Sequence, residues 1–151
     1  MGASAPIFKG TIMPSNTQAV GVAFSDPEFT TCYASQEIGY SAAAQGAVTQ
    51  LTSKATGVTL NTSAGRITMN NASLAAATAV SFVLTNSSIS INDTIIVCVS
   101  SNTTGSALGA YTTYVSYLAA GSALITLRNL TAATSYSEAV IINFSIIHGA
   151  S

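Results

Sequence analysis

The residues of this sequence that could carry out acid–base chemistry are few and scattered. Asp26 and Glu28 flank Pro27, and two carboxylates can act as acid and base in glycoside hydrolysis when a pocket sets their pKa values apart. An acidic pair around a proline is also an ordinary composition for a turn. Because nothing in the sequence places this pair in a pocket, we interpret residues 26–28 as a surface turn.

The other candidates for chemistry are single groups. His148 stands beside Gly149 and could ligate a metal or contact a partner, but no second histidine and no cysteine or carboxylate stands at ligand spacing. Lys54 lies in the stretch TSKATG, which lacks the Gly-Lys-Ser/Thr step of a phosphate-binding loop. We therefore expect a solvated histidine, no metal or cofactor, and no enzymatic activity.

Charged residues are rare along the whole chain. They make up 6% of its 151 residues and give a formal net charge of −1, whereas ordinary soluble domains carry about 25% charged residues. Without a cluster of Lys or Arg, the chain lacks the basic surface that nucleic acids and anionic membranes require. A protein this neutral tends to associate, which favours a tightly packed assembly. Arg128, Glu138 and Asp93 are expected at strand ends, where an ion pair among them would fix register or a subunit contact.

The sequence also bears on the compartment in which the chain folds. No window of about 20 continuous apolar residues is present, as a membrane-spanning helix would need. The first ten residues lack a basic segment followed by an apolar core, so we expect synthesis and folding in a cytoplasm. In that compartment Cys32 and Cys98 are expected to be free thiols.

Residues 1–38 differ in character from the rest of the chain and are predicted to form an irregular N-terminal arm. They contain all three prolines and several aromatic residues without sustained periodicity, with one short strand expected at residues 19–24. Apolar side chains flanked by prolines suit strand addition or groove docking to a neighbouring subunit. The predicted partner-binding residues are Ile7, Phe8, Ile12 and Met13.

Residues 39–151 are predicted to form one β domain, because short apolar runs alternate with turn-forming residues. In residues 79–86, Val80, Phe82 and Leu84 share one face of a strand. Residues 94–100 are apolar on both faces, which predicts a central strand. Alternation is equally regular in residues 123–127 and 139–147.

Two further segments carry turn and aromatic signals. Residues 58–60 and 66–69 flank a turn-rich loop and read as a hairpin. In the strand predicted around residues 111–118, regular alternation places Tyr111 and Tyr117 on one face and Tyr114 on the other. These rings are expected to fill a core and an interface, with a carbohydrate platform as the alternative. Six or seven such strands indicate an all-β fold, an antiparallel β-sandwich or a jelly-roll-like domain.

The strings VTQLTSKATGVTLN (residues 48–61) and GRITM (65–69), with LRNLTAATSYSEAVIINFSII further on, resemble a β-rich module of tailed-bacteriophage virion proteins. The resemblance covers about residues 39–147 and includes capsid decoration, or cement, proteins. The sequence departs from the expected pattern at residues 42–45 and 132–134, where glycines are usual.

This resemblance implies a non-enzymatic, homotrimeric subunit of β-sandwich or jelly-roll-like fold. Such a subunit binds the major capsid protein on the capsid surface of a virion, after synthesis in the host cytoplasm, and stabilises the shell. Similar modules occur on head and tail fibres, so the alternative is an adhesion or receptor-binding module that recognises surface glycans. An adhesin would expose aromatic residues at a loop apex, whereas a decoration protein would bury them between protomers.

Overall fold

The computed structural model describes residues 38–103 and 108–149. The chain divides after Ile38, and the second unit, Gly39–Ser151, contains all the secondary structure given below. The predictions for the N-terminal arm lie outside the described residues. They concern the turn at 26–28, the strand at 19–24, the thiol of Cys32, and Ile7, Phe8, Ile12 and Met13.

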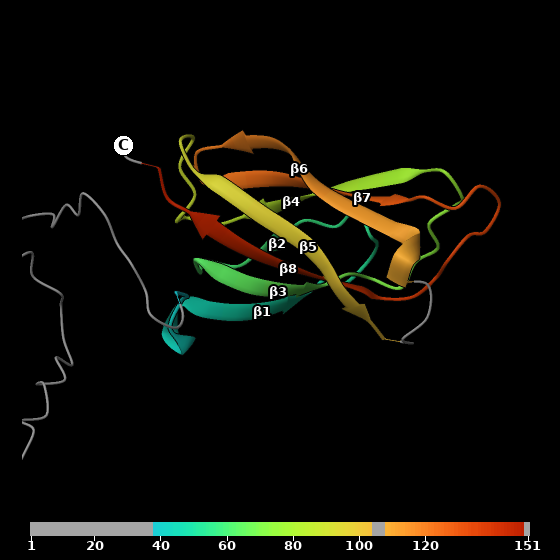
Figure 1. The fold of residues 1–151 in the computed structure, drawn as a ribbon, viewed down its shortest axis with the longest axis horizontal. Helices are drawn as coiled ribbons and strands as arrows, with labels where there is room; N and C mark the ends of the chain where they lie inside the picture. The colour runs from blue at the N-terminus through green and yellow to red at the C-terminus, as the bar shows by residue number, and fades with distance from the viewer. Residues whose placement is uncertain (1–37, 104–107, 150–151) are drawn as a thin grey trace, which may run out of the picture. The chain divides into compact units, whose positions relative to one another are not determined.

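Two four-stranded sheets pack as a β-sandwich, which confirms the predicted all-β fold (Figure 1). The first sheet has the order β1-β3-β8-β5 and the second has the order β2-β4-β7-β6. The strands of the first are β1 (Gln45–Thr49), β3 (Ala64–Thr68), β8 (Val140–Ile147) and β5 (Thr94–Asn102). Those of the second are β2 (Val58–Thr59), β4 (Ala79–Thr85), β7 (Ser122–Asn129) and β6 (Tyr111–Ala119).

Neighbouring strands run antiparallel except at one edge of each sheet, where β1 pairs with β3 and β2 pairs with β4 in parallel. Two short 3-10 turns, η1 (Ala42–Ala44) and η2 (Leu108–Ala110), complete the described structure. None of the helices in the described ranges is long and apolar enough to cross a membrane.

The core lies between the sheets and follows the predicted alternation. Phe82 and Leu84 of β4 are buried while Val83 between them is exposed. The same period-2 pattern buries Ile125 and Leu127 in β7. The four predicted inward residues of β8 are likewise buried: Val140, Ile142, Phe144 and Ile146. Alternating apolar residues therefore place their inner face against the opposite sheet, as the sequence predicts.

The predicted hairpin at residues 58–69 is wrong, because its two strands belong to different sheets. β2 pairs with β4 of the second sheet, whereas β3 lies between β1 and β8 of the first. The connecting segment crosses from one sheet to the other, with the Leu60 N–H donating to the Thr85 carbonyl at 3.0 Å. Turn-forming residues mark a change of direction, but they do not say whether the next strand pairs with the previous one.

The central position predicted for residues 94–100 is also wrong. β5 is an edge strand of the first sheet and pairs only with β8. The outward side chain of Ile96 is 53% exposed, and Cys98 on the same face is an exposed free cysteine. The ladder to β8 is interrupted at Ser100, between Val99 and Ser101. Such a bulge protects an exposed edge from pairing with other chains.

Candidate interaction surfaces

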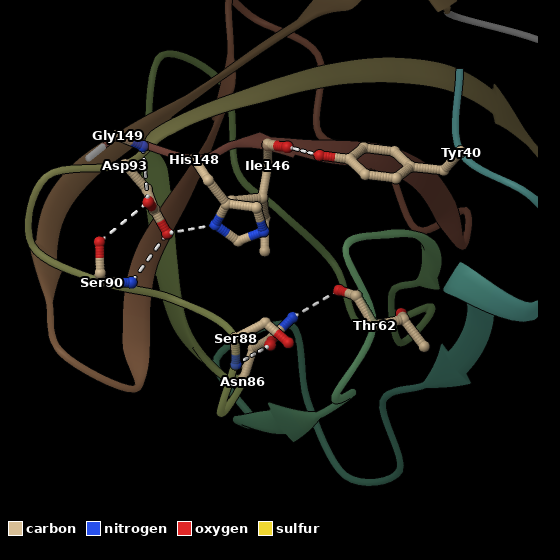
Figure 2. A network of polar contacts seen from close by, with 9 residues as sticks. All are labelled: Tyr40, Thr62, Asn86, Ser88, Ser90, Asp93, Ile146, His148 and Gly149. Carbon is tan, nitrogen blue, oxygen red and sulfur yellow. Dashed lines mark hydrogen bonds and ion pairs between the residues drawn. The ribbon is translucent and has the colours of Figure 1, made fainter. Parts of the chain in front are cut away.

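Asp93 holds the end of β8 to the loop before β5 (Figure 2). Its carboxylate accepts hydrogen bonds from the Ser90 N–H at 2.8 Å, the Ser90 hydroxyl at 2.9 Å and the Gly149 N–H at 3.1 Å. These bonds, the Ser90 N–H foremost, lower the pKa of Asp93 to about 2. The carboxylate is therefore a structural acceptor whose lone pairs are already engaged.

His148 is the fourth partner of this carboxylate. Its Nδ1 lies 3.2 Å from Asp93 Oδ2, and its side chain is 47% exposed. The histidine is exposed, as predicted, but it is also paired with Asp93, which the sequence did not indicate. Next to it, a Cβ at Gly149 would collide with the Asn92 carbonyl oxygen, so the close approach of the two segments requires glycine. Within residues 38–103 and 108–149, no group of three His, Cys, Asp or Glu residues could hold a metal ion.

Lys54 and Glu138 form a second buried polar cluster at the end of the sandwich where β3 and β5 finish and β8 begins. Lys54 is 3% exposed, and its Nζ donates to the main-chain carbonyls of Asn70 at 2.5 Å and Glu138 at 2.7 Å. Burial lowers the pKa of Lys54, and the Glu138 charge opposes that shift. The carboxylate of Glu138 accepts a bond from Asn102 Nδ2 at 3.4 Å. This lysine therefore joins strand ends and is not available as a nucleophile.

Tyr111 is buried beside Glu138, and both its own burial and this neighbour change the pKa of its hydroxyl. Desolvation raises the pKa of Tyr111, and the adjacent Glu138 carboxylate raises it further.

The predicted ion pair among Arg128, Glu138 and Asp93 is wrong, because the two carboxylates lie in separate clusters and Arg128 is exposed. In the part of the chain that the structure describes, the only ion pair is that between His148 and Asp93.

Tyr114 and Tyr117 lie on the same, outer face of the second sheet, contrary to the predicted alternation. The ladder between β6 and β7 shifts at Ser116, between Val115 and Tyr117. Val115 and Leu118 both pack against the core, so the extra residue turns Tyr117 outward. The two rings are 46% and 65% exposed. Tyr111, predicted to share a face with Tyr117, is buried.

The tyrosines continue an apolar surface across the second sheet, which we call the β6 face: Val83, Tyr114, Tyr117 and Leu124. Val83, Leu124 and Tyr117 occupy one row across β4, β7 and β6. Tyr114 lies in the adjacent row, opposite Thr126. A strand surface of this kind is flat, and none of its four members carries a charge.

The hydroxyl groups of Ser81 and Thr126, in the row of Tyr114, and of Ser116 in the bulge are bonded to one another. Thr126 Oγ1 lies 2.8 Å from Ser81 Oγ and donates to Ser116 Oγ at 2.9 Å. Ser116 Oγ in turn donates to the Leu124 carbonyl at 3.2 Å. The hydroxyls beside the β6 face are thus satisfied within the sheet, and covering them costs little in lost hydrogen bonds.

Sequence reasoning missed the β6 face because the bulge has no signal of its own. Ser116 is a small polar residue between Val115 and Tyr117, as in any amphipathic strand. The predicted partner-binding residues Ile7, Phe8, Ile12 and Met13 lie outside the described residues. No protein-family model matches the chain, and neither does any curated protein or any solved structure.

Proposed function

We propose that this chain is a non-enzymatic subunit of a phage virion, which decorates the capsid surface and binds the major capsid protein as a homotrimer. The observation that carries the proposal is the uncharged, aromatic β6 face. The sequence resemblance to decoration proteins and the rarity of charged residues support the same assignment.

The use of the charged side chains supports a structural role. Lys54, Asp93 and Glu138 are buried and each holds main-chain or side-chain groups from distant parts of the sandwich. Of the charged residues that the structure describes, Arg66 and Arg128 alone are exposed. The two carboxylates that the structure describes, Asp93 and Glu138, are thus engaged in holding the fold.

The β6 face suits contact with other copies of the same chain. Tyrosine is enriched in protein interfaces because it buries a large apolar area at low cost in conformational entropy. Tyr114 and Tyr117 stand on a strand, whereas an adhesin would place its aromatic residues at a loop apex. Two neutral faces can meet without desolvating a charge.

The N-terminal arm supplies the contact to the shell in this proposal. Ile7, Phe8, Ile12 and Met13 are its large apolar residues near the prolines, and they would dock on the major capsid protein. Three arms on one trimer raise the effective concentration of each, which gives firm attachment from modest individual contacts.

Sedimentation tests both parts of the proposal. The purified chain is run alone and with undecorated capsids, beside a version that lacks residues 1–35 and a Tyr117→Ser variant. We expect the full chain to be a trimer that co-sediments with capsids, the truncated chain to be a trimer that does not, and Tyr117→Ser to be monomeric. Ile91→Ser, which removes an exposed apolar residue outside the β6 face, should behave as the unchanged chain.

A failure of capsid binding by every version would contradict decoration.

The exposure of the Tyr114 and Tyr117 rings on a single chain is the observation that favours the alternative, a glycan-binding module, because aromatic rings also stack on sugars. In that case Tyr114→Ser and Tyr117→Ser would abolish binding to glycans and leave the oligomeric state unchanged.

A further inference from the structure

A pocket of about 430 Å³ lies over strands β1, β3 and β8 of the first sheet, within the size range of ligand sites. Its polar lining comes from Tyr40, Gln45, Arg66, Asn143 and Ser145, and small residues such as Ala64 leave it open. The Tyr40 hydroxyl donates to the carbonyl of Ile146 (Figure 2), which fixes this side of the pocket to β8.

Arg66 and Asn143 stand directly opposite each other in the β3–β8 ladder. Both side chains are exposed, and opposed residues of an antiparallel pair have Cβ atoms about 5 Å apart. Ser100 Oγ donates to Asn143 Oδ1 at 3.3 Å. Because its oxygen accepts from Ser100 of β5, the amide of Asn143 has its N–H groups as its remaining polar groups, and both it and Arg66 line the pocket. Two neighbouring donors, one of them charged, therefore face the pocket.

The charge of this donor pair selects the ligand. Arg66 forms no ion pair with any residue that the structure describes, and Asp93 and Glu138 are engaged in their own buried clusters. A guanidinium binds a carboxylate through two parallel hydrogen bonds, and a neighbouring amide can complete the contact. One cation balances a singly charged carboxylate and leaves a doubly charged phosphate uncompensated.

We propose that the Arg66 pocket binds the carboxylate of an acidic side chain in an extended segment of a partner protein. β1 is an edge strand of its sheet, and the backbone of an edge can pair with an incoming strand. Ala47 of β1 stands in the same row as Arg66 and Asn143. Its methyl group leaves an acidic side chain on the added strand a clear path to the guanidinium. The residues that line this pocket all come from the β domain, and the test of the site needs no capsid.

Backbone amide NMR spectra of the full chain, titrated with two blocked peptides, test the proposal. One peptide alternates threonine with glutamate, and its neutral counterpart alternates threonine with glutamine. We expect the glutamate peptide to shift the signals of β1 and those of Arg66 and Asn143 saturably, and the glutamine peptide to have no comparable effect. Arg66→Gln should weaken binding about tenfold or more, the effect of losing one charge-assisted hydrogen bond. Arg66→Lys should give an intermediate loss because the planar fork is gone.

Arg128→Gln is the matched control, because it removes one exposed arginine from the other sheet and should leave the affinity unchanged. Equal losses in the Arg66→Gln and Arg128→Gln variants would mean nonspecific attraction and would overturn the proposal. So would equal binding of the two peptides, or no binding of either. Glucuronate that shifts the same signals while the glutamate peptide does not would replace the protein partner by an acidic sugar. The native dispersion of the amide spectrum shows in each case that the variant is folded.

Discussion

Lys54 and Glu138, 84 positions apart in the sequence, are joined by a hydrogen bond of 2.7 Å from the lysine Nζ to the glutamate main-chain carbonyl. The same nitrogen binds the Asn70 carbonyl, so one side chain ties the end of β3 to the start of β8. Both residues are buried, and the charge of Glu138 opposes the lowering of the Lys54 pKa by burial. This cluster fixes one end of the sandwich through hydrogen bonds from one side chain.

The first prediction follows from the buried charges of this cluster. Lys54→Met should lower the free energy of unfolding by about 3 kcal/mol, because two main-chain carbonyls lose their donor and the buried Glu138 carboxylate loses a nearby positive charge. The double variant Lys54→Met/Glu138→Gln should recover part of that loss, since it removes the orphaned charge as well. Urea unfolding of the unchanged chain, the single variants Lys54→Met and Glu138→Gln, and the double variant measures both effects. Strict additivity of the two single losses would show that the charges are not coupled.

A second prediction concerns the pH dependence of stability at Asp93. The pKa of its carboxyl group falls from an ordinary 3.8 to about 2 on folding, so the carboxylate form stabilises the fold. That contribution is complete above about pH 4 and is lost as the pH falls through 2. Asp93→Asn should therefore be less stable than the unchanged chain at pH 7, and the difference should shrink steadily below about pH 4. Urea unfolding across this range measures it.

His148→Gln is the control for the Asp93 variant. The histidine is half-exposed and contributes least to the lowered pKa of Asp93, after the bonds from Ser90 and Gly149. It should therefore change the acid dependence much less than Asp93→Asn does. An equal change in the two variants would mean that the ion pair, and not the hydrogen bonds to the main chain, sets the pKa.

The sequence predicted strands well where burial on one face is regular. Phe82 and Leu84 alternate with exposed residues, and their period of two needs no knowledge of pairing partners. The sequence predicted poorly the features that depend on neighbouring strands, such as the position of a strand within its sheet. Ile96 is apolar, as in a central strand, but whether a sheet continues beyond it is decided by the order of strands, which local composition does not encode.

The candidate site shows the same limit. The neutral surface was foreseeable from the rarity of charge, whereas the placing of Tyr117 beside Tyr114 depends on one inserted residue in a ladder. A single-residue shift turns every following side chain to the opposite face, so alternation alone cannot locate it.

A third prediction concerns Asn129, whose side chain is fully buried and organises the loops next to β7. Its Nδ2 donates to the carbonyls of Leu74, Ala75 and Thr134, and its Oδ1 accepts from the N–H and hydroxyl of Thr131. Asn129→Ala should lower the free energy of unfolding by about 3 kcal/mol, because these buried groups lose their partner. Asn143→Ala, at an exposed strand position, should cost far less. Thermal and urea unfolding compare the two, and similar losses would contradict the structural role of Asn129.

The last prediction tests the bulge that forms the β6 face. Deleting Ser116 removes the extra residue and joins Val115 directly to Tyr117, whose partners on β7 are already adjacent, so Tyr117 should stay outward and Leu118 inward. The free energy of unfolding should therefore fall by only about 1 kcal/mol, the usual contribution of the hydroxyl bonds that Ser116 makes. Quenching of tyrosine fluorescence by iodide should be retained, because the most exposed ring of the β6 face stays on the outer surface. Ser116→Ala keeps the extra residue and removes only its hydroxyl bonds, so it should retain the quenching of the unchanged chain. A deletion variant that loses about 3 kcal/mol of stability together with its quenching would mean that the ladder does not close across the deleted position, and would contradict the assignment of Ser116 as the extra residue.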